Sequence, residues 1–339
     1  MIKDSNTVLV TGGAGAIGAN LVRALINNND CNKVVIVDNF SSGFHNNLED
    51  LGSEKIELIN GNICDQSAID EAFSHNIDYV YHLAVNFANQ NSVNNPEKDL
   101  MTNGIGTVKV LQASVDNNVK KFLLSSSSCV YKPGEERFVE HGPVELTTPY
   151  AITKMLSEYY VTFYSKFYNL PAVIVRYFNS YGPGIRPGKF RGVVPNFFYR
   201  AMNGLPLVIT GDGRETRPFT YVQDVVDGTI CAMKRSKNIG LEKFYGHPID
   251  ADDNVIYNIG NSNSITILEL AEKINDICEN SAGIEYISKR NWDMIPNRAV
   301  QNDKAKRELN FEPKYSVDKG LRLTYEWFRQ QGFKLEDSE

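Results

Sequence analysis

The chain has 339 residues, of which 42% are hydrophobic and 22% are charged, so its composition is that of a folded globular protein. Its formal net charge is −6 and it contains no run of lysine and arginine, which argues against a nucleic-acid or membrane-surface partner. The five cysteines form no C-x-x-C pair, so neither a disulfide framework nor a metal site is predicted. With no signal peptide and no membrane-spanning apolar run, a cytoplasmic protein is expected.

Strand and helix patterns alternate through the first half of the chain. Short apolar runs that resemble strands are separated by longer stretches with helical periodicity, among them 96–117 and 149–169. This order predicts an α/β fold with a doubly wound parallel sheet of the Rossmann type. The predicted strands lie at residues 7–12, 33–39, 55–61, 78–84, 120–127 and 171–182.

The alternation stops after Tyr181, where the Gly- and Pro-rich stretch YGPGIRPGKFRG begins. We expect residues 1–180 to form the first domain and residues 181–339 to form a smaller mixed α/β domain that binds the substrate. Apolar strand and helix patterns resume at about 221–236 and 255–261, so these segments are expected to return to the first domain.

The stretch TGGAGAIG places Gly12, Gly15 and Gly18 between a predicted strand and a predicted helix. Glycine allows the tight turn and lets backbone N–H groups approach a pyrophosphate at the helix N-terminus. Asp38 ends the second predicted strand, where a carboxylate can accept hydrogen bonds from ribose hydroxyls and would repel a 2′-phosphate. Asn39 offers no compensating positive charge, so the sequence favours NAD over NADP.

The stretch PYAITK places Tyr150 and Lys154 four residues apart at the start of a predicted helix, and therefore on one face. A free tyrosine ionises near pH ~10, so holding it as a phenolate at neutral pH costs about 4 kcal/mol. The Lys154 cation, the helix N-terminus and the positive nicotinamide of NAD all favour the phenolate. Tyr150 is therefore a candidate base.

Several motifs in a fixed order resemble one superfamily. The glycine turn, Asp38, YHLA, Asn103 before GIGT, the run SSSSC, PYAITK and RYFNSYGP resemble the extended short-chain dehydrogenases/reductases. Within this superfamily the pattern is most similar to the nucleotide-sugar epimerases and dehydratases, in particular the UDP-glucose 4-epimerases. The resemblance implies bound NAD and a nucleotide-diphosphate sugar as substrate, with UDP-sugars favoured.

The resemblance also implies roles for individual residues. Tyr150 would be the base on the sugar 4-hydroxyl, Lys154 would hold the nicotinamide ribose, and Ser127 would hydrogen-bond the reacting oxygen. The implied substrate contacts are Ser127, Ser128, Asn179, Arg186, Val194, Arg217 and Arg290. The implied cofactor contacts are Gly12, Gly15, Ala16, Ile17, Gly18, Asp38, Asn39, Ser42, Gly43, Asn62, Ile63, Leu83, Ala84, Asn103, Ser125, Tyr150, Lys154 and Tyr177.

The residues after Ser127 help to choose among reactions. Dehydratases and decarboxylases of this kind carry an acid there, whereas this chain has Ser128 and Cys129, which disfavours 4,6-dehydration. SSCVY also resembles 3,5-epimerases in which the cysteine moves a proton, but the second acid/base of those enzymes is replaced by Val193. We therefore expect a 4-epimerase that acts on a UDP-hexose or UDP-uronate and needs only one base.

Four alternatives stay open. The chain could be a nucleotide-sugar C4 dehydrogenase or reductase that releases its cofactor, a 4,6-dehydratase, a 3,5-epimerase that uses Cys129, or an NAD-sensing protein without catalysis. Arg186 is a candidate ligand for a C5 carboxylate, opposite Ser127 and Ser128. The stretch 157–169 carries six aromatic residues, more than a narrow buried stripe requires, and by resemblance it predicts a homodimer.

Overall fold

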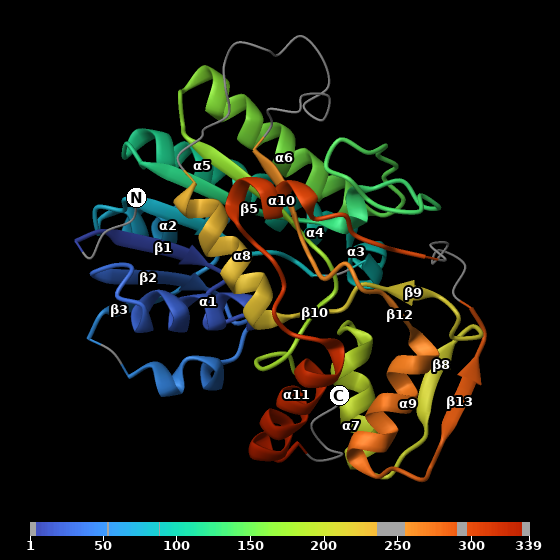
Figure 1. Cartoon of the computed structure of the whole chain (residues 1–339). Helices are drawn as coiled ribbons and strands as arrows, with labels where there is room; N and C mark the ends of the chain where they lie inside the picture. The colour runs from blue at the N-terminus through green and yellow to red at the C-terminus, as the bar shows by residue number, and fades with distance from the viewer. Residues whose placement is uncertain (1–4, 53, 88, 236–254, 290–296, 334–339) are drawn as a thin grey trace.

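The computed structural model describes residues 5–52, 54–87, 89–235, 255–289 and 297–333. Within these residues, seven parallel strands form the central sheet in the spatial order β11-β6-β5-β4-β1-β2-β3 (Figure 1). The strand order reverses between β1 and β4, so the predicted doubly wound fold is confirmed. The strands are β1 Thr7–Thr11, β2 Lys33–Asp38, β3 Ile56–Asn60, β4 Tyr79–His82, β5 Lys121–Ser127, β6 Ala172–Tyr177 and β11 Ile256–Ile259.

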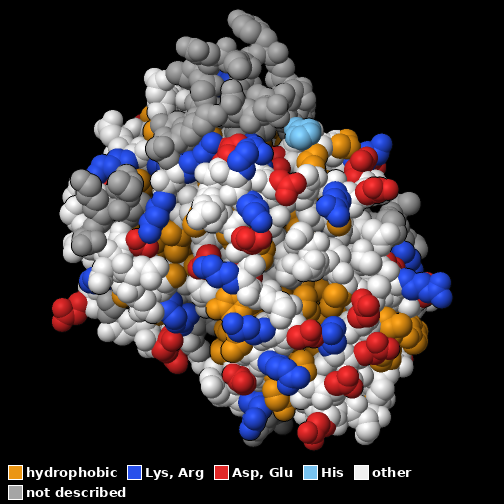
Figure 2. All heavy atoms as spheres, viewed as in Figure 1, with side chains coloured by type: hydrophobic (Ala, Val, Ile, Leu, Met, Phe, Trp, Pro, Cys, Tyr) orange, Lys and Arg blue, Asp and Glu red, His pale blue; other side chains and the backbone are white. Residues whose placement is uncertain are grey.

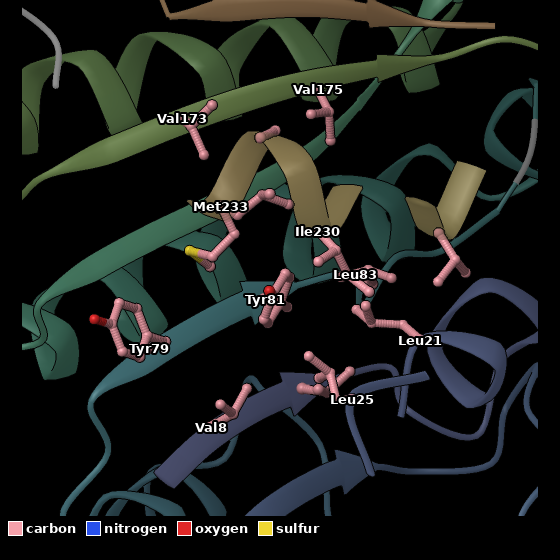
Figure 3. Packing of buried hydrophobic residues seen from close by; sticks show 14 of the residues in the cluster. Val8, Leu21, Leu25, Tyr79, Tyr81, Leu83, Val173, Val175, Ile230 and Met233 are labelled. Carbon is pink, nitrogen blue, oxygen red and sulfur yellow. The ribbon is translucent and has the colours of Figure 1, made fainter. Parts of the chain in front are cut away.

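Helices cover both faces of the central sheet. Side chains of a strand alternate between the two faces, so each face carries apolar side chains that a layer of helices buries. In β1, Val8 joins the apolar core on one face and Leu9 joins the core on the other. Figure 3 shows Val8 on the first face together with Leu21 and Ile230, which come from two of the helices that cover it. These helices are α1 Ala16–Asn27, α8 Val222–Lys234 and α10 Asp303–Leu309, and the second face packs against α2 Gln66–Phe73, α5 Thr107–Asp116 and α6 Pro149–Phe167.

The single helix predicted over 96–117 is divided in the structure. A short helix α4, Pro96–Asp99, runs into a π-helical stretch, Leu100–Gly106, before α5 begins. A π turn holds one more residue than an α turn, so it changes the direction in which the following side chains point. Here it accompanies an inward-facing Asn103, whose side chain contacts α6.

A smaller region is built around a separate apolar core between α7, α9 and α11. Its strands form three short pairs, β7 with β10, β9 with β12, and β8 with β13. Between β10 and β12 the chain crosses back, so that α8 packs on the large sheet and β11 pairs with β6. The bounds are β7 Ser180–Tyr181, α7 Val193–Met202, β8 Leu207–Thr210, β9 Thr216–Arg217, β10 Thr220–Tyr221, β12 Ile265–Thr266, α9 Ile267–Cys278, β13 Ile284–Ile287 and α11 Val317–Gln331.

Charged side chains of both signs lie on the face of the molecule shown in Figure 2. On the face shown in Figure 2, basic and acidic side chains are interspersed, so this face offers no continuous basic area. Among the described residues, no helix has both the length and the apolarity that a membrane crossing requires. The same residues contain no group of three or more His, Cys, Asp or Glu that could hold a metal ion.

Candidate active site

A cavity of about 910 Å³ opens at the carboxyl edge of the central sheet, between the sheet and the smaller region. Its walls include residues at or just beyond the ends of β1, β2, β4, β5 and β6, together with the start of α7. Sheets with this strand order bind ligands at that edge, outside the point where the order reverses. The volume lies within the ~300–1,000 Å³ usual for small-molecule sites.

The turn between β1 and α1 forms one end of this cavity. Gly12 has a φ of 72°, and a Cβ atom there would lie 2.7 Å from the backbone nitrogen of Ala84, so a larger residue would not fit. Gly15 and Ala16 line the cavity where α1 begins. Backbone N–H groups and the helix dipole both favour negative charge at such a point, so the turn suits a pyrophosphate.

Asp38 is held rigidly at the end of β2. Its carboxylate accepts hydrogen bonds from the backbone nitrogens of Ala14 and Phe40, both at 2.8 Å. Burial raises the pKa of Asp38, while these backbone hydrogen bonds oppose the increase. The other acceptor positions of the carboxylate remain for ribose hydroxyls, and its charge disfavours a 2′-phosphate. The glycine turn and Asp38 together fit NAD.

Tyr150, Lys154 and Ser127 all line the cavity. Helix α6 begins at Pro149, and Thr148 caps it by accepting a hydrogen bond from the backbone nitrogen of Ala151 at 3.2 Å. One helical turn then places Tyr150 and Lys154 on the same face. The Lys154 Nζ donates to the backbone oxygen of Ser125 at 2.7 Å and lies 6.0 Å from the centre of the Tyr150 ring.

Burial governs the ionisation of this group. It raises the pKa of Tyr150 above its ordinary value, and a hydrogen bond with Ser127 opposes the increase only in part. Burial also lowers the pKa of Lys154 to about 8, although the Asp99 and Glu158 carboxylates favour its protonated form. The expected lowering of the tyrosine pKa is thus not a property of the folded chain alone. Deprotonation of Tyr150 depends on positive charge beside it, which Lys154 supplies while protonated.

Most of the residues that the sequence assigned to cofactor and substrate lie in the wall of this one cavity, although they come from widely separated parts of the chain. Besides Tyr150, Lys154 and Ser127, they are Gly12, Gly15, Ala16, Ile17, Gly18, Asp38, Asn39, Ser42, Gly43, Asn62, Ile63, Leu83, Ala84, Ser125, Ser128, Tyr177, Asn179, Val194 and Arg217.

Two predicted contacts, Asn103 and Arg186, do not lie in the wall of this cavity. Asn103 is buried away from the cavity, where its side-chain oxygen accepts from the Asn86 backbone nitrogen at 2.8 Å and its amide nitrogen donates to Asp99 at 3.0 Å. Its polar atoms therefore tie the π-helical stretch to its neighbours. Arg186 is also absent from the wall, because its guanidinium lies over the Phe44 ring, 4.2 Å from the centroid. Arg290 lies outside the described residues.

Arg298 is a site residue that the sequence did not reveal. It lines the cavity and is buried, with 8% of its surface exposed. Its Nε atom has no hydrogen-bond partner among the described residues, and its Nη1 atom lies 3.8 Å from the sulfur of Cys129. Its backbone nitrogen donates to the Thr216 oxygen at 3.1 Å, which fixes the segment. No motif marks Arg298, because only tertiary packing brings it to the serine run.

Cys129 lies in the same wall as Arg298. The Asn89 side-chain nitrogen is 3.5 Å from its sulfur, and the Cys129 backbone nitrogen donates to Ser127 Oγ at 3.2 Å. The carboxylates that line the cavity among the described residues are Asp38 and Glu215, and Glu215 pairs with Lys289 at 3.0 Å. The reacting end of the site is therefore formed by hydroxyls, a phenol, an ammonium group, a thiol and a guanidinium.

The sequence of the chain is similar to those of a known protein family and its members. The chain matches the NAD dependent epimerase/dehydratase family over residues 8–260. It is 35% identical over 333 residues to a UDP-N-acetyl-alpha-D-glucosaminuronate decarboxylase of Bacillus cytotoxicus, covering 95% of this chain and 97% of the relative.

Solved structures show the same relationship. The epimerase Mth375 of Methanothermobacter thermautotrophicus superposes with a TM-score of 0.89 and 41% identity, covering 97% of this chain and 93% of that one. A UDP-glucuronic acid 4-epimerase of Bacillus cereus, solved with UDP-glucuronic acid and NAD, has a TM-score of 0.85 and 28% identity. That match covers 96% of this chain and 99% of the other.

Proposed function

The chain belongs to the NAD dependent epimerase/dehydratase family, and on that premise we propose that it is a 4-epimerase of UDP-sugars that acts on UDP-uronates. The cofactor of the family is NAD, and the glycine turn and Asp38 would hold its pyrophosphate and ribose. The observation that carries the proposal is the meeting of Tyr150, Lys154 and Ser127 in a cavity whose wall, in the described part of the chain, carries Asp38 and Glu215 as its carboxylates, each held by other partners.

Each of the three residues has one task. NAD, held by the turn at Gly12 and Gly15 and by Asp38, would supply the acceptor and donor of the hydride at C4 of the sugar. Tyr150 removes the proton of the 4-hydroxyl through its phenolate oxygen, and Ser127 donates a hydrogen bond to the same sugar oxygen. Lys154 stabilises the phenolate while it is protonated. After the 4-keto sugar has turned about its link to the diphosphate, Tyr150 returns the proton and the C4 configuration is inverted.

The cavity wall, among the described residues, offers no carboxylic acid that is free to act on the sugar, which disfavours dehydration. Dehydration has to protonate a leaving hydroxyl, which calls for a proton donor close to the sugar. The two positions after Ser127 are Ser128 and Cys129, and the cavity carboxylates Asp38 and Glu215 have other partners. A single base at Tyr150 is sufficient for removal and return of one proton at the same oxygen, so 4-epimerisation is the reaction that this site supports best.

Arg298 favours a uronate over a neutral hexose. A buried guanidinium is costly unless an anion pairs with it, and the described part of the chain supplies none. Its closeness to Cys129, two residues beyond Ser127, supports a position near the sugar rather than near the adenosine end. A carboxylate on C5 would complete its hydrogen bonds in the planar geometry that arginine prefers.

The same contact would protect the substrate. Oxidation of a uronate at C4 produces a β-keto acid, which loses its carboxyl group as neutral CO₂. Arg298 stabilises the carboxylate charge, and that charge is dispersed as CO₂ departs. The pairing therefore stabilises the ground state more than the transition state for decarboxylation, and slows it.

Decarboxylation is the second candidate function. Its support is the 35% identical Bacillus cytotoxicus relative, which is a uronate decarboxylase, and the uronate decarboxylases of several eukaryotes that are 31–32% identical. The chain would then bind the same substrate through Arg298 but release CO₂ after oxidation at C4. The product distinguishes this reaction from epimerisation without ambiguity.

The test is NMR of the NAD-loaded protein with UDP-glucuronate, and separately with UDP-glucose, in D₂O. A 4-epimer with no deuterium on carbon supports the proposal, because the hydride then returns from the cofactor. A UDP-pentose with release of CO₂ replaces it with the decarboxylase. Deuterium at C3 or C5 of an epimer would instead indicate carbon deprotonation with Cys129 as acid/base. Accumulation of free NADH would indicate a dehydrogenase.

We also propose a homodimer, formed through α6. Phe167 is 71% exposed, and Phe163 stacks on it with the ring centres 4.5 Å apart. Exposed apolar side chains of the neighbouring π-helical stretch extend the surface, among them Leu100 and Met101. An apolar surface formed by two adjacent helices favours burial against a second copy.

A further inference from the structure

The C-terminal end of β5, Ser125 to Ser127, pairs with a neighbouring strand on one side only. The pairing of β4 with β5 ends at His82 opposite Leu124, whereas β5 continues to Ser127. Beyond Leu124 the strand pairs only with β6, through Ser125, Ser126 and Ser127. The segment that carries the reacting Ser127 is therefore held by a ladder on one side only, and something else has to fix its position.

Helix α6 supplies the missing support from the face that carries the catalytic residues. Tyr150, Lys154 and Glu158 are spaced four residues apart, so they form one row along the helix. Lys154 holds the backbone oxygen of Ser125 at 2.7 Å. Glu158 accepts a hydrogen bond from the Ser126 hydroxyl. Successive members of the row thus reach successive residues of the strand end.

Glu158 is itself fixed by a buried arginine. Arg176 on β6 donates through Nη2 to one carboxylate oxygen at 2.6 Å and through Nε to the other at 2.9 Å. Its Nη1 atom donates to the backbone oxygen of Glu140 at 3.1 Å, and its guanidinium lies 4.7 Å from the Tyr131 ring centre. Arg176 stands opposite Ser126 in the β5–β6 register, so strand, helix and ion pair meet at one point.

We propose that Ser126, Glu158 and Arg176 are positioning residues that hold Ser127 in place relative to Tyr150. The inference rests on the proposed function, because it concerns the reaction that Ser127 and Tyr150 carry out. A hydrogen bond from Ser126 to a carboxylate that cannot move ties the free edge of the strand to the helix that carries the base. An apolar core of similar volume would often give equal stability, so the ion pair is better explained by the orientation that it imposes.

Ser126→Ala tests the proposal, because it removes one hydroxyl and leaves the Glu158–Arg176 pair intact. We expect kcat to fall about tenfold to hundredfold while KM stays within about twofold, since a misplaced reacting group affects the chemical step. Ser126→Thr keeps the hydroxyl and should recover most of the rate. Ser114→Ala is the matched control, because Ser114 is a buried serine on α5 whose hydroxyl only donates to the Val110 oxygen.

Amide hydrogen exchange of the NAD-loaded proteins gives a readout that does not depend on activity. Ser126→Ala should speed exchange at residues 125–129, and Ser114→Ala should not. Rates are measured with whichever UDP-sugar the wild-type protein oxidises, so a product other than the 4-epimer overturns the proposed function and leaves this inference standing. Unchanged exchange at 125–129, or a rate for Ser126→Ala equal to that of the control, overturns the inference.

Discussion

The two sides of the cavity differ in how their polar groups are satisfied. Around Tyr150 the fold provides partners: Lys154 holds a backbone oxygen, Glu158 holds Ser126, and Thr148 caps the helix. Elsewhere in the cavity wall, among the described residues, three buried polar atoms lack partners, namely Arg298 Nε, Ser180 Oγ and Tyr199 Oη. The polar groups around Tyr150 therefore have partners within the fold, whereas the proposed substrate side keeps buried polar atoms that a polar ligand could satisfy.

This comparison is tested most strongly at Tyr150. Tyr150→Phe removes the base without changing the ring, so C4 oxidation should slow by about a thousandfold while NAD remains bound. Tyr164→Phe is the control, because Tyr164 is also on α6 and its hydroxyl only donates to Gln112 at 3.0 Å. Rates are followed as the formation of reduced nicotinamide in a single turnover. A Tyr150→Phe protein with at least a tenth of the wild-type rate would contradict the assignment of the base.

Arg298→Gln tests the part of the cavity wall whose buried polar atoms lack hydrogen-bond partners among the described residues. If Arg298 pairs with a carboxylate, the variant should bind UDP-glucuronate roughly tenfold to a hundredfold more weakly, from a charged hydrogen bond worth about 1.5–3 kcal/mol. Binding of UDP-glucose and UDP should hardly change. Calorimetry on the NAD-loaded proteins measures all three affinities without requiring turnover.

The control for this experiment is Arg200→Gln, since Arg200 also lines the cavity but its Nε already donates to the Pro206 oxygen at 2.6 Å. An equal loss of affinity for all three ligands would mean that Arg298 contacts the diphosphate. No loss for any ligand would leave the uronate proposal without its main support.

The pH dependence of the reaction rate tests the Tyr150 side of the cavity, where the polar groups have partners within the fold. Burial lowers the pKa of Lys154 from 10.5 to about 8, so Lys154 is charged below that pH and loses its charge above it. The reacting state, a Tyr150 phenolate beside a charged Lys154, holds one proton fewer than the fully protonated pair and the same number as neutral Tyr150 with neutral Lys154. Because burial raises the pKa of Tyr150, the rate should rise as pH increases toward about 8 and level off above it. Lys154→Arg keeps its charge, so its rate should continue to rise above pH 8, whatever its absolute value. A rate that levels off near the same pH in the arginine variant would contradict the assignment.

The smallest effect on catalysis is expected at the α6 surface, which lies outside the cavity. Phe167→Glu should convert a dimer to a monomer in light scattering, because it places a charge in the proposed apolar interface, while the rate per chain changes little. Tyr286→Glu is the control, since Tyr286 is an aromatic side chain on β13, outside α6, and is 54% exposed. A wild-type mass equal to one chain at every concentration would refute the dimer.

Local pattern in the sequence was sufficient for the sheet and for a few candidate residues of the site, whereas the resemblance supplied the others. The period of two in strands and 3.6 in helices is imposed by backbone geometry, so the alternation of elements and the four-residue spacing of Tyr150 and Lys154 were readable directly. The glycine turn and Asp38 follow the same logic, because both depend on the ends of single elements. The break in the helix at 100–106 was missed, since helical periodicity alone does not distinguish a π turn.

The tertiary structure decided which residues that are far apart in the chain come into contact. Arg298 approaches Cys129 across 169 positions, Arg176 pairs with the carboxylate of Glu158 on another element, and Asn103 faces inward although its motif suggested the cofactor. The sequence by itself determined which helices and strands form and which reactive side chains lie at the ends of these elements, because both properties are local. Which charges are paired in advance and which are left for a ligand was decided only by packing, because burial and hydrogen-bond partners are properties of the assembled fold.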